Sequence, residues 1–190
     1  MTLFYRHWCM PNSDTFQMEP VREILRRFVA KGMMSVDPFS RNSLWCEYTN
    51  DLNPSTTASC HMPADKFLRM LLTPHAGKVD LVLFDPPYSP RQISECYKIA
   101  GIECSTSETQ NAALYLRCRK AISQLVKPGG IVISFGWNSS GMGKGFEKQE
   151  IHLVCHGAAH NDTIVVVDKK IVSQNELFLS NPNRAYAPII

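Results

Sequence analysis

The stretch Asp85-Pro86-Pro87-Tyr88 places an acid, two rigid residues and an aromatic ring directly after an aliphatic run, residues 81–84. Proline fixes its own φ and pushes the preceding residue toward an extended conformation, so this loop must be stiff. Carboxylate and backbone carbonyl oxygens only accept hydrogen bonds, and they suit a group with two N–H bonds to donate. A tyrosine ring offers a planar base a stacking surface. The four residues could therefore hold the exocyclic amine of a flipped base, or form a proline turn with a buried aromatic.

Two further acids, Asp37 and Asp51, also follow short apolar runs, as Asp85 does. In a mainly parallel sheet the carboxyl ends of the strands meet at one edge, and ligands bind in the crevice there. Aspartate is common in turns, so each acid alone could be an ordinary turn residue. Three acids at three predicted strand ends favour a shared site at that edge.

The elements that must position these acids alternate between strands and helices. Helical spacing of apolar residues predicts helices over residues 19–30, 63–72 and 108–126, and apolar runs predict strands over 33–37, 44–51, 79–85, 131–135, 149–156 and 162–167. The run VDLVLFD is nearly all aliphatic, which is typical of a strand buried on both faces of a sheet. The last two strands could pair as a hairpin at the carboxyl-terminal edge of the sheet. The pattern predicts an α/β fold with a doubly wound, mainly parallel sheet and an antiparallel C-terminal hairpin.

A chain of 190 residues, 44% of them hydrophobic, can bury one sizeable core, and we expect a single domain over residues 1–190. The net charge of +3 at pH 7 is mild, so it permits a nucleic-acid partner without requiring one. No apolar run approaches the roughly 20 residues that span a bilayer, and the first residues lack the order of a signal peptide. We therefore expect a soluble protein of the cytoplasm with no membrane partner.

Seven cysteines, never spaced as CxxC, indicate reduced structural thiols rather than a disulfide framework or a zinc site. The segment HLVCHGAAH gathers three histidines, but its aliphatic content and the nearby TIVVV predict a strand. On a strand His152 and His156 would lie about 13 Å apart, which is too far for one metal ion. We expect no metal site.

The run LVLFDPPY resembles motif IV of the amino-methyltransferases that act on adenine in DNA. That family uses S-adenosylmethionine and has a Rossmann-like class I methyltransferase fold, a doubly wound sheet with an antiparallel carboxyl-terminal strand. An aspartate at the first position of the motif is typical of adenine enzymes, and a serine is typical of enzymes that act on cytosine. The resemblance implies that Asp85 and the carbonyl of Pro86 hold the N6 amine of adenine, in the stiff loop that Pro87 completes, while Tyr88 stacks on the base.

Other segments resemble further motifs of this family, in the family's order. VDPFSRNS resembles motif I, which cradles the methionine part of the cofactor, and Asn50-Asp51 matches the site for the ribose hydroxyls. Ala64-Asp65 resembles the motif that receives the adenine amine, and Thr15-Phe16 matches a pair placed over the methionine moiety. The resemblance implies these cofactor-binding residues: Thr15, Phe16, Asp37, Phe39, Ser40, Asn42, Asn50, Asp51, Asp65 and Asp85.

The similarity covers about residues 11–167, and the whole chain is similar to small adenine methyltransferases of phages and prophages. This implies a phage- or prophage-encoded protein that acts in a bacterial host cell. One departure concerns motif I, where Arg41 and Ser43 replace two glycines of the family pattern. Either the loop binds the cofactor differently, with Asn42 or Ser43 bonded to its carboxylate and Arg41 paired with it, or it has lost cofactor binding.

A second departure is that we find no separate target-recognition domain. Recognition would then fall to the predicted loops over residues 89–109 and 138–148, to a homodimer, or to a partner protein. The second loop, NSSGMGKGFEK, fits either a mobile segment that tracks a phosphate backbone or a disordered surface turn. Two alternatives to DNA adenine methylation stay open. One is the same chemistry on RNA or a nucleotide, and the other is a non-catalytic nucleic-acid-binding or partner subunit.

Overall fold

The computed structural model describes residues 1–102, 111–157 and 160–172. The strands are β1 (Leu3–Trp8), β2 (Ser35–Asp37), β3 (Tyr48–Thr49), β4 (Val79–Phe84), β5 (Val126–Gly136), β6 (Phe146–Cys155) and β7 (Thr163–Lys170). The helices are α1 (Glu19–Phe28), α2 (Ala64–His75), α3 (Pro90–Ile99) and α4 (Asn111–Leu125), with a short 3-10 helix, η1, at Thr15–Gln17. None of the helices within the described ranges is long and apolar enough to cross a membrane.

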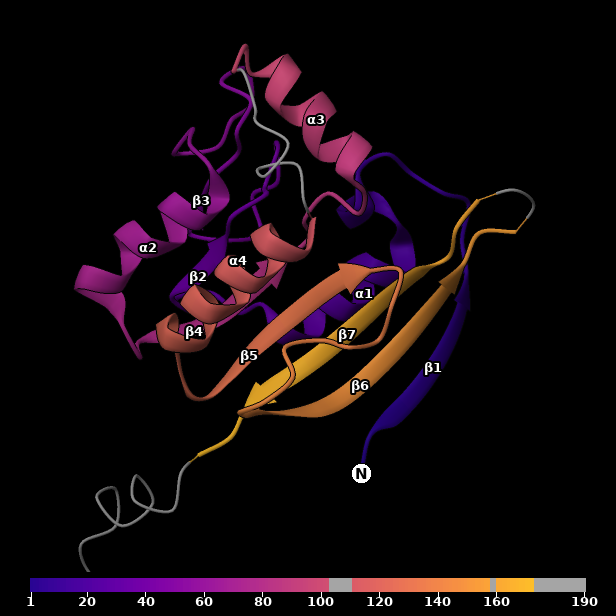
Figure 1. Cartoon of the computed structure of the whole chain (residues 1–190). Coiled ribbons are helices and arrows are strands. Elements are labelled where there is room, and N and C mark those ends of the chain that lie inside the picture. Colours follow the sequence, from indigo (N-terminus) through magenta and orange to yellow (C-terminus); the bar gives the residue numbers. More distant parts are fainter. Residues whose placement is uncertain (103–110, 158–159, 173–190) are drawn as a thin grey trace, which may run out of the picture.

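The strands form one sheet in the order β1-β6-β7-β5-β4-β2-β3. Within this sheet β7 runs antiparallel to both β5 and β6, and every other pairing is parallel. Figure 1 shows the arrow of β7 pointing opposite to those of β5 and β6. The carboxyl ends of the other six strands therefore meet at one edge, as the three acids predicted.

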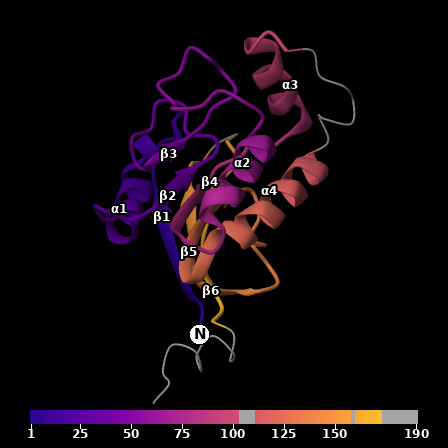
Figure 2. The ribbon, with the colours of Figure 1, turned by 90° about the vertical axis from the view of Figure 1, so that its left-hand side faces the viewer.

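Helices cover both faces of the sheet, with α1 on one side and α2 and α4 on the other (Figure 2). The alternation of side chains along β4 supplies both layers. Leu81 and Leu83 pack on the α1 side, while Val82 and Phe84 pack on the α2 and α4 side. All four side chains are buried, which confirms the prediction of a strand covered on both faces.

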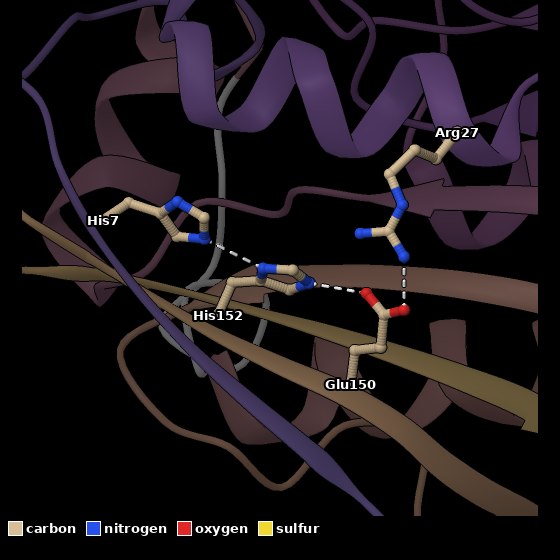
Figure 3. A network of polar contacts seen from close by, with 4 residues as sticks. All are labelled: His7, Arg27, Glu150 and His152. Atoms are coloured by element: carbon tan, nitrogen blue, oxygen red, sulfur yellow. Dashed lines mark hydrogen bonds and ion pairs between the residues drawn. The ribbon is translucent and has the colours of Figure 1, made fainter.

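The strand β1 was not predicted, because its residues are mostly exposed and carry no clear apolar alternation. It pairs in parallel with β6, and a polar network joins it to α1 (Figure 3). His7 Nε2 lies 3.0 Å from His152 Nδ1, and His152 Nε2 lies 2.8 Å from Glu150 Oε2. Arg27 of α1 donates to the other oxygen of Glu150 at 2.5 Å, and the Tyr5 ring stacks on His152 with centroids 4.6 Å apart.

Two other predictions need correction. The segment 89–109 was expected to be a loop, but residues 90–99 form α3, which starts at Pro90 and is capped by Ser89 Oγ, the acceptor of the Gln92 amide at 3.2 Å. The hairpin of β6 and β7 is antiparallel as expected, yet it does not form the edge of the sheet, because β1 pairs with the outer side of β6. Residues 103–109 of the predicted loop and 108–110 of the predicted helix lie outside the described residues.

Candidate active site

A cavity of about 490 Å³ lies at the carboxyl edge of the sheet, and each strand that ends there contributes to its wall. The contributing segments come from far apart in the sequence but are adjacent at this edge, because all six parallel strands end there. Their residues are Pro11, Asn12 and Ser13 after β1, Phe39 and Arg41 after β2, Asp51 after β3, Asp85 to Tyr88 after β4, Trp137 after β5, and His156 after β6.

The residues Asp85 to Tyr88 lie together on the cavity wall. Tyr88 Oη donates to Asp85 Oδ1, and the Tyr88 amide donates to Gln92 Oε1 of α3 at 2.6 Å. Burial raises the pKa of Asp85 above its usual value, and hydrogen bonds from Tyr88 and Thr15 act against that rise. The loop thus presents a carboxylate and a tyrosine that are held relative to each other.

Four carboxyl groups lie at or near the cavity: Asp51 and Asp85 line it, and Asp14 and Asp37 lie close enough for their charges to interact with the others. Asp37 is fully buried, with Oδ1 accepting the Phe39 amide at 3.0 Å, while its Oδ2 atom is buried and has no partner among the described residues. Burial raises the pKa of Asp37 well above its usual value, and the charges of Asp85, Asp51 and Asp14 raise it further. A cationic ligand would relieve this repulsion, so the site suits a ligand with positive groups.

The motif I loop is a tight turn in which Arg41 has a φ of 51°, in the left-handed region. The turn is closed by the Ser43 amide, which donates to the Ser40 carbonyl at 2.8 Å. The Arg41 amide donates to Asp51 Oδ2 at 3.1 Å, and its guanidinium donates to the Ser13 carbonyl. The loop therefore adopts at Arg41 a conformation that favours glycine, and bonds from three segments hold it there.

Beside the main cavity lies a narrow apolar slot of about 60 Å³. Phe39 and Asp51 border both spaces, and Leu52, Met62 and Ile93 supply apolar walls. A flat aromatic ring would bury its faces in such a slot while its polar edge lay near Asp51.

The structure brings seven of the predicted site residues to the main cavity: Thr15, Phe39, Asp51, Asp85, Pro86, Pro87 and Tyr88. Asn50 borders the slot, but its side-chain amide is bonded to the Pro38 carbonyl at 3.1 Å and the Met62 carbonyl at 3.0 Å. Asn50 therefore positions the two loops that carry Phe39 and Met62.

Besides Asp37, which is fully buried, four other predicted residues border neither space. Phe16 packs in the core against Phe135. Ser40 is buried and donates to the Asn50 carbonyl at 3.3 Å, and Asn42 accepts the Thr57 amide at 3.0 Å.

The fourth of these is Asp65, whose carboxylate is paired with Arg69 at 2.5 Å and with Arg117 at 2.9 Å. Its neighbour Ala64 does border the slot. The carboxylate thus joins α2 to α4 instead of standing on the slot wall.

Sequence reasoning missed several wall residues, among them Trp137, His156 and Thr163. Trp137 comes two residues after the predicted strand 131–135, and His156 is the last residue of the predicted strand 149–156, so the strand-end argument used for the acids would have found them. Both ring nitrogens of His156 have partners, the Cys9 carbonyl and Thr163 Oγ1, each at 2.9 Å. Across the described part of the chain, no group of three or more His, Cys, Asp or Glu side chains is placed to hold a metal ion.

No protein-family model matches the chain, and a search of curated proteins finds no match either. Solved structures do share its fold. PH0851 superposes with a TM-score of 0.54 at 12% identity, over 78% of this chain and 44% of that protein. SMU.1697c from Streptococcus mutans is named as a candidate methyltransferase and was solved in complex with SAH. It superposes with a TM-score of 0.52 at 12% identity, over 85% of this chain and 100% of that protein. TrmN from Thermus thermophilus superposes with a TM-score of 0.50 at 18% identity, over 81% of this chain and 49% of that protein.

The chain spans less than half the length of PH0851 and of TrmN. At these identities the likeness concerns the fold. The predicted Rossmann-like methyltransferase fold, with its mainly parallel sheet and antiparallel strand, is confirmed.

Proposed function

We propose that this protein transfers a methyl group from S-adenosylmethionine to the N6 amine of adenine in DNA. The observation that carries the proposal is the acidic cavity at the carboxyl edge of the sheet, with the Asp-Pro-Pro-Tyr loop on its wall. The acid accepts hydrogen bonds, the ring stacks, and the surroundings favour a cationic donor. Methyl transfer to an aromatic amine requires that the amine is held, that the base is positioned and that the cationic methyl donor is bound, and each feature meets one of these requirements.

The residues present fit the cofactor. A space of about 490 Å³ with an adjoining apolar slot is within the usual range for such ligands, about 300–1,000 Å³. The carboxylates of Asp51 and Asp85 on the cavity wall suit its sulfonium and ammonium groups. Asp51 would accept the ribose hydroxyls, the slot would take the adenine ring, and Arg41 would pair with the carboxylate. When bound, the cofactor supplies an electrophilic methyl group.

The chain's own residues would hold the amine that receives this group. Asp85 and the Pro86 carbonyl would each accept one N–H bond, which keeps the nitrogen lone pair available and oriented. Tyr88 already donates to one oxygen of Asp85, and a carboxylate has lone pairs for further donors. The tyrosine hydroxyl would thus fix the carboxylate while the ring gives the base a surface to stack on.

We propose that one domain performs the reaction and that its own loops, a second copy of the chain, or a partner protein recognise the target sequence. The same chemistry on RNA or on a nucleotide is the alternative within the enzymes, since Asp85 and Tyr88 contact only the base. A non-catalytic subunit is the alternative of another class, and it rests on the replacement of two motif I glycines by Arg41 and Ser43.

The test is the identity of the methylated nucleoside. DNA and RNA from cells that express the chain, and from cells that express the Asp85→Ala variant, would be digested and analysed by mass spectrometry. We expect N6-methyldeoxyadenosine in DNA only with the unaltered chain. N4-methyldeoxycytidine as the main product would show that the assignment to adenine is wrong. If methylated adenosine is found only in RNA, the substrate is RNA and not DNA. No heat of binding with millimolar S-adenosylmethionine in calorimetry would overturn catalysis altogether.

A further inference from the structure

A second hollow of about 470 Å³ adjoins the main cavity, and Tyr88 and Trp137 border both spaces. We call this second hollow the flanking pocket; its other walls include Tyr115 and Arg119 of α4 and Asn138 of the loop after β5. It is nearly as large as the main cavity and joins it at the tyrosine of the Asp-Pro-Pro-Tyr loop. A ligand that reaches Asp85 through the shared wall therefore has room for a neighbouring unit of similar size.

The flanking pocket offers aromatic rings to that neighbouring unit. The ring of Trp137 lies with its centroid 5.5 Å from that of Tyr88, and 45% of Trp137 is exposed to solvent. Tyr115 supplies a further ring, which packs edge-on against Phe84 at 5.6 Å. Exposed rings with fixed positions are what a nucleic-acid base stacks on, whatever its sequence.

Arg119 provides positive charge in the same pocket. Its Nη2 atom donates to Ser140 Oγ at 3.3 Å, and its guanidinium carbon lies 5.7 Å from the Tyr115 ring centroid. The Arg119 Nε atom is buried and has no hydrogen-bond partner in the described part of the chain. No ion pair within the described ranges joins this guanidinium to a carboxylate, although Arg119 interacts electrostatically with Asp168. Its terminal nitrogens, of which Nη2 also bonds to Ser140, can meet a phosphate, whose geometry they match.

The loop that forms the outer wall is fixed in place. The Met142 amide donates to Asp168 Oδ2 at 2.8 Å, and Lys148 donates to the Ser139 carbonyl at 2.5 Å. Gly141 has a φ of 58°, and a Cβ there would lie 2.2 Å from Asp168 Oδ2, so this position requires glycine. The flanking pocket is thus preformed, which lowers the entropy cost of binding.

We propose that the flanking pocket binds the nucleotide next to the target base in a DNA strand. The base of that nucleotide lies against Trp137 and Tyr115, and its phosphate lies on Arg119. The inference rests on the proposed function and deepens it, because it makes the substrate a polynucleotide strand in place of a free nucleotide. Two adjoining pockets of similar size, aromatic in their shared wall and cationic at one end, match two successive nucleotides.

The test measures binding of a fluorescein-labelled single-stranded DNA 12-mer by anisotropy, with SAH present. The variants are Arg119→Met, Arg119→Lys and Trp137→Ala. Lys120→Met is the matched control, since it removes the same charge from the next, exposed position of α4. We expect Arg119→Met to raise Kd about tenfold, Arg119→Lys to raise it less, and Trp137→Ala to raise it at least about fivefold. Lys120→Met should raise it less than about threefold.

The salt dependence separates a phosphate contact from a structural role. Loss of one phosphate contact should lower the slope of log Kd against log salt concentration by about 0.7 for a single strand. A misfolded variant would not change the slope in this specific way, and circular dichroism would detect it. If Arg119→Met and Lys120→Met have equal Kd values and slopes, the flanking pocket does not hold the strand.

Other results overturn one proposal without the other. If the unaltered chain methylates DNA and binds it independently of Arg119 and Trp137, the inference about the pocket fails and the function stands. If the chain binds DNA through both residues but methylates no nucleoside, the proposed function fails. If an RNA 12-mer of the same sequence binds more tightly than the DNA 12-mer, and if this binding depends on Arg119, the flanking pocket binds RNA and the assignment to DNA is wrong.

Discussion

Asp85 is the residue on which the proposed chemistry depends most. It is the acid of a stiff loop, its carboxylate is fixed by Tyr88, and its pKa is raised because burial outweighs the hydrogen bonds from Tyr88 and Thr15. The ionised form accepts the N–H bonds of the target amine, whereas the protonated form cannot do so at every oxygen. The acid limb of the activity profile should therefore lie above the usual pKa of an aspartate.

Replacing Asp85 by alanine should lower methyl transfer at least about 100-fold, because the amine loses its principal acceptor. Binding of S-adenosylmethionine should change less than about tenfold, since Asp51 remains on the cavity wall to attract its cationic groups and the main role of Asp85 is to hold the target amine. Single-turnover transfer and calorimetry measure the two quantities, and the exposed Glu23→Ala variant serves as control. Activity that survives in the Asp85→Ala variant would show that this acid does not hold the amine.

Arg41 shows how the motif I loop folds without the first of its two glycines. Its φ of 51° costs an L-residue roughly 1–2 kcal/mol, and the bonds to Asp51 and Ser13 help to hold it. Ser43, at the second glycine position, does not have a positive φ. Only the first replacement is therefore strained, and the loop retains its turn.

Because Arg41 is strained, we expect its glycine variant to be more stable than its alanine variant, which reverses the usual order. Arg41→Gly should be more stable than Arg41→Ala by about 1 kcal/mol, because glycine adopts the left-handed region without strain. At Leu44, an exposed residue of the same loop without a positive φ, the alanine variant should be the more stable one. Urea unfolding of the four variants measures both differences. If the alanine variant is the more stable one at both Arg41 and Leu44, the backbone at Arg41 is not strained.

At the scale of elements, β1 is held to the sheet by the network of His7, His152, Glu150 and Arg27. With Glu150 ionised, neutral His152 donates from Nε2 to Glu150 and accepts at Nδ1 from His7 Nε2–H. Burial lowers the pKa of His152, although its bond to Glu150 acts against this. Burial alone would raise the pKa of Glu150, but the bonds from Arg27 and His152 lower it.

Both lowered pKa values mean that the unfolded chain binds more protons than the folded chain, so stability is lost as the pH falls. The loss should begin below about pH 6.5 through His152 and continue below about pH 4.5 through Glu150. His152→Gln should flatten the dependence between pH 7 and 5, because an amide does not titrate. Urea unfolding at several pH values would measure this, with the exposed His61→Gln as control. An unchanged slope in His152→Gln would show that this network does not cause the acid sensitivity.

The helix α3 carries part of the site wall but was not predicted from the sequence. The helix α3 follows a serine and a proline, which are ordinary signals for a helix start, but its exposed and polar face obscured the apolar spacing. Its Gln92 and Cys96 line the cavity, so an element expected to be a loop forms part of the site wall.

At the scale of the whole molecule, the carboxyl groups at and near the cavity should favour cationic ligands. The charges of Asp85, Asp51 and Asp14 raise the pKa of Asp37, and for Asp85 the charge of Arg41 lowers the pKa while that of Asp14 raises it. A polyphosphate nucleotide should be repelled by this cluster, whereas a donor with sulfonium and ammonium groups should be attracted.

Ligand-dependent stability tests this selectivity. At 100 times its Kd, S-adenosylmethionine should stabilise the fold by about 2.7 kcal/mol, which corresponds to a Tm rise of roughly 5–10 °C for a chain of this size. ATP at the same concentration should cause little change. Asp51→Asn should lose most of the rise with S-adenosylmethionine, because Asp51 borders both cavity and slot. Equal shifts with both ligands would contradict selection by charge.

The sequence by itself determined the layers and the edge of the sheet at which the site lies. Aliphatic runs, helical spacing and acids at strand ends have short-range causes. Asp37, Asp51 and Asp85 all lie at the carboxyl ends of strands, although Asp37 is buried and does not line the cavity. Only the tertiary structure decided which side chains reach the cavity. Phe16, Asn42 and Asp65 fit the family's motifs, yet core packing or local partners hold their side chains elsewhere. Trp137 and His156 lie at strand ends that the sequence did indicate. The side chains of α3 reach the cavity only because tertiary packing brings that helix to the same edge, a long-range effect that local sequence does not encode.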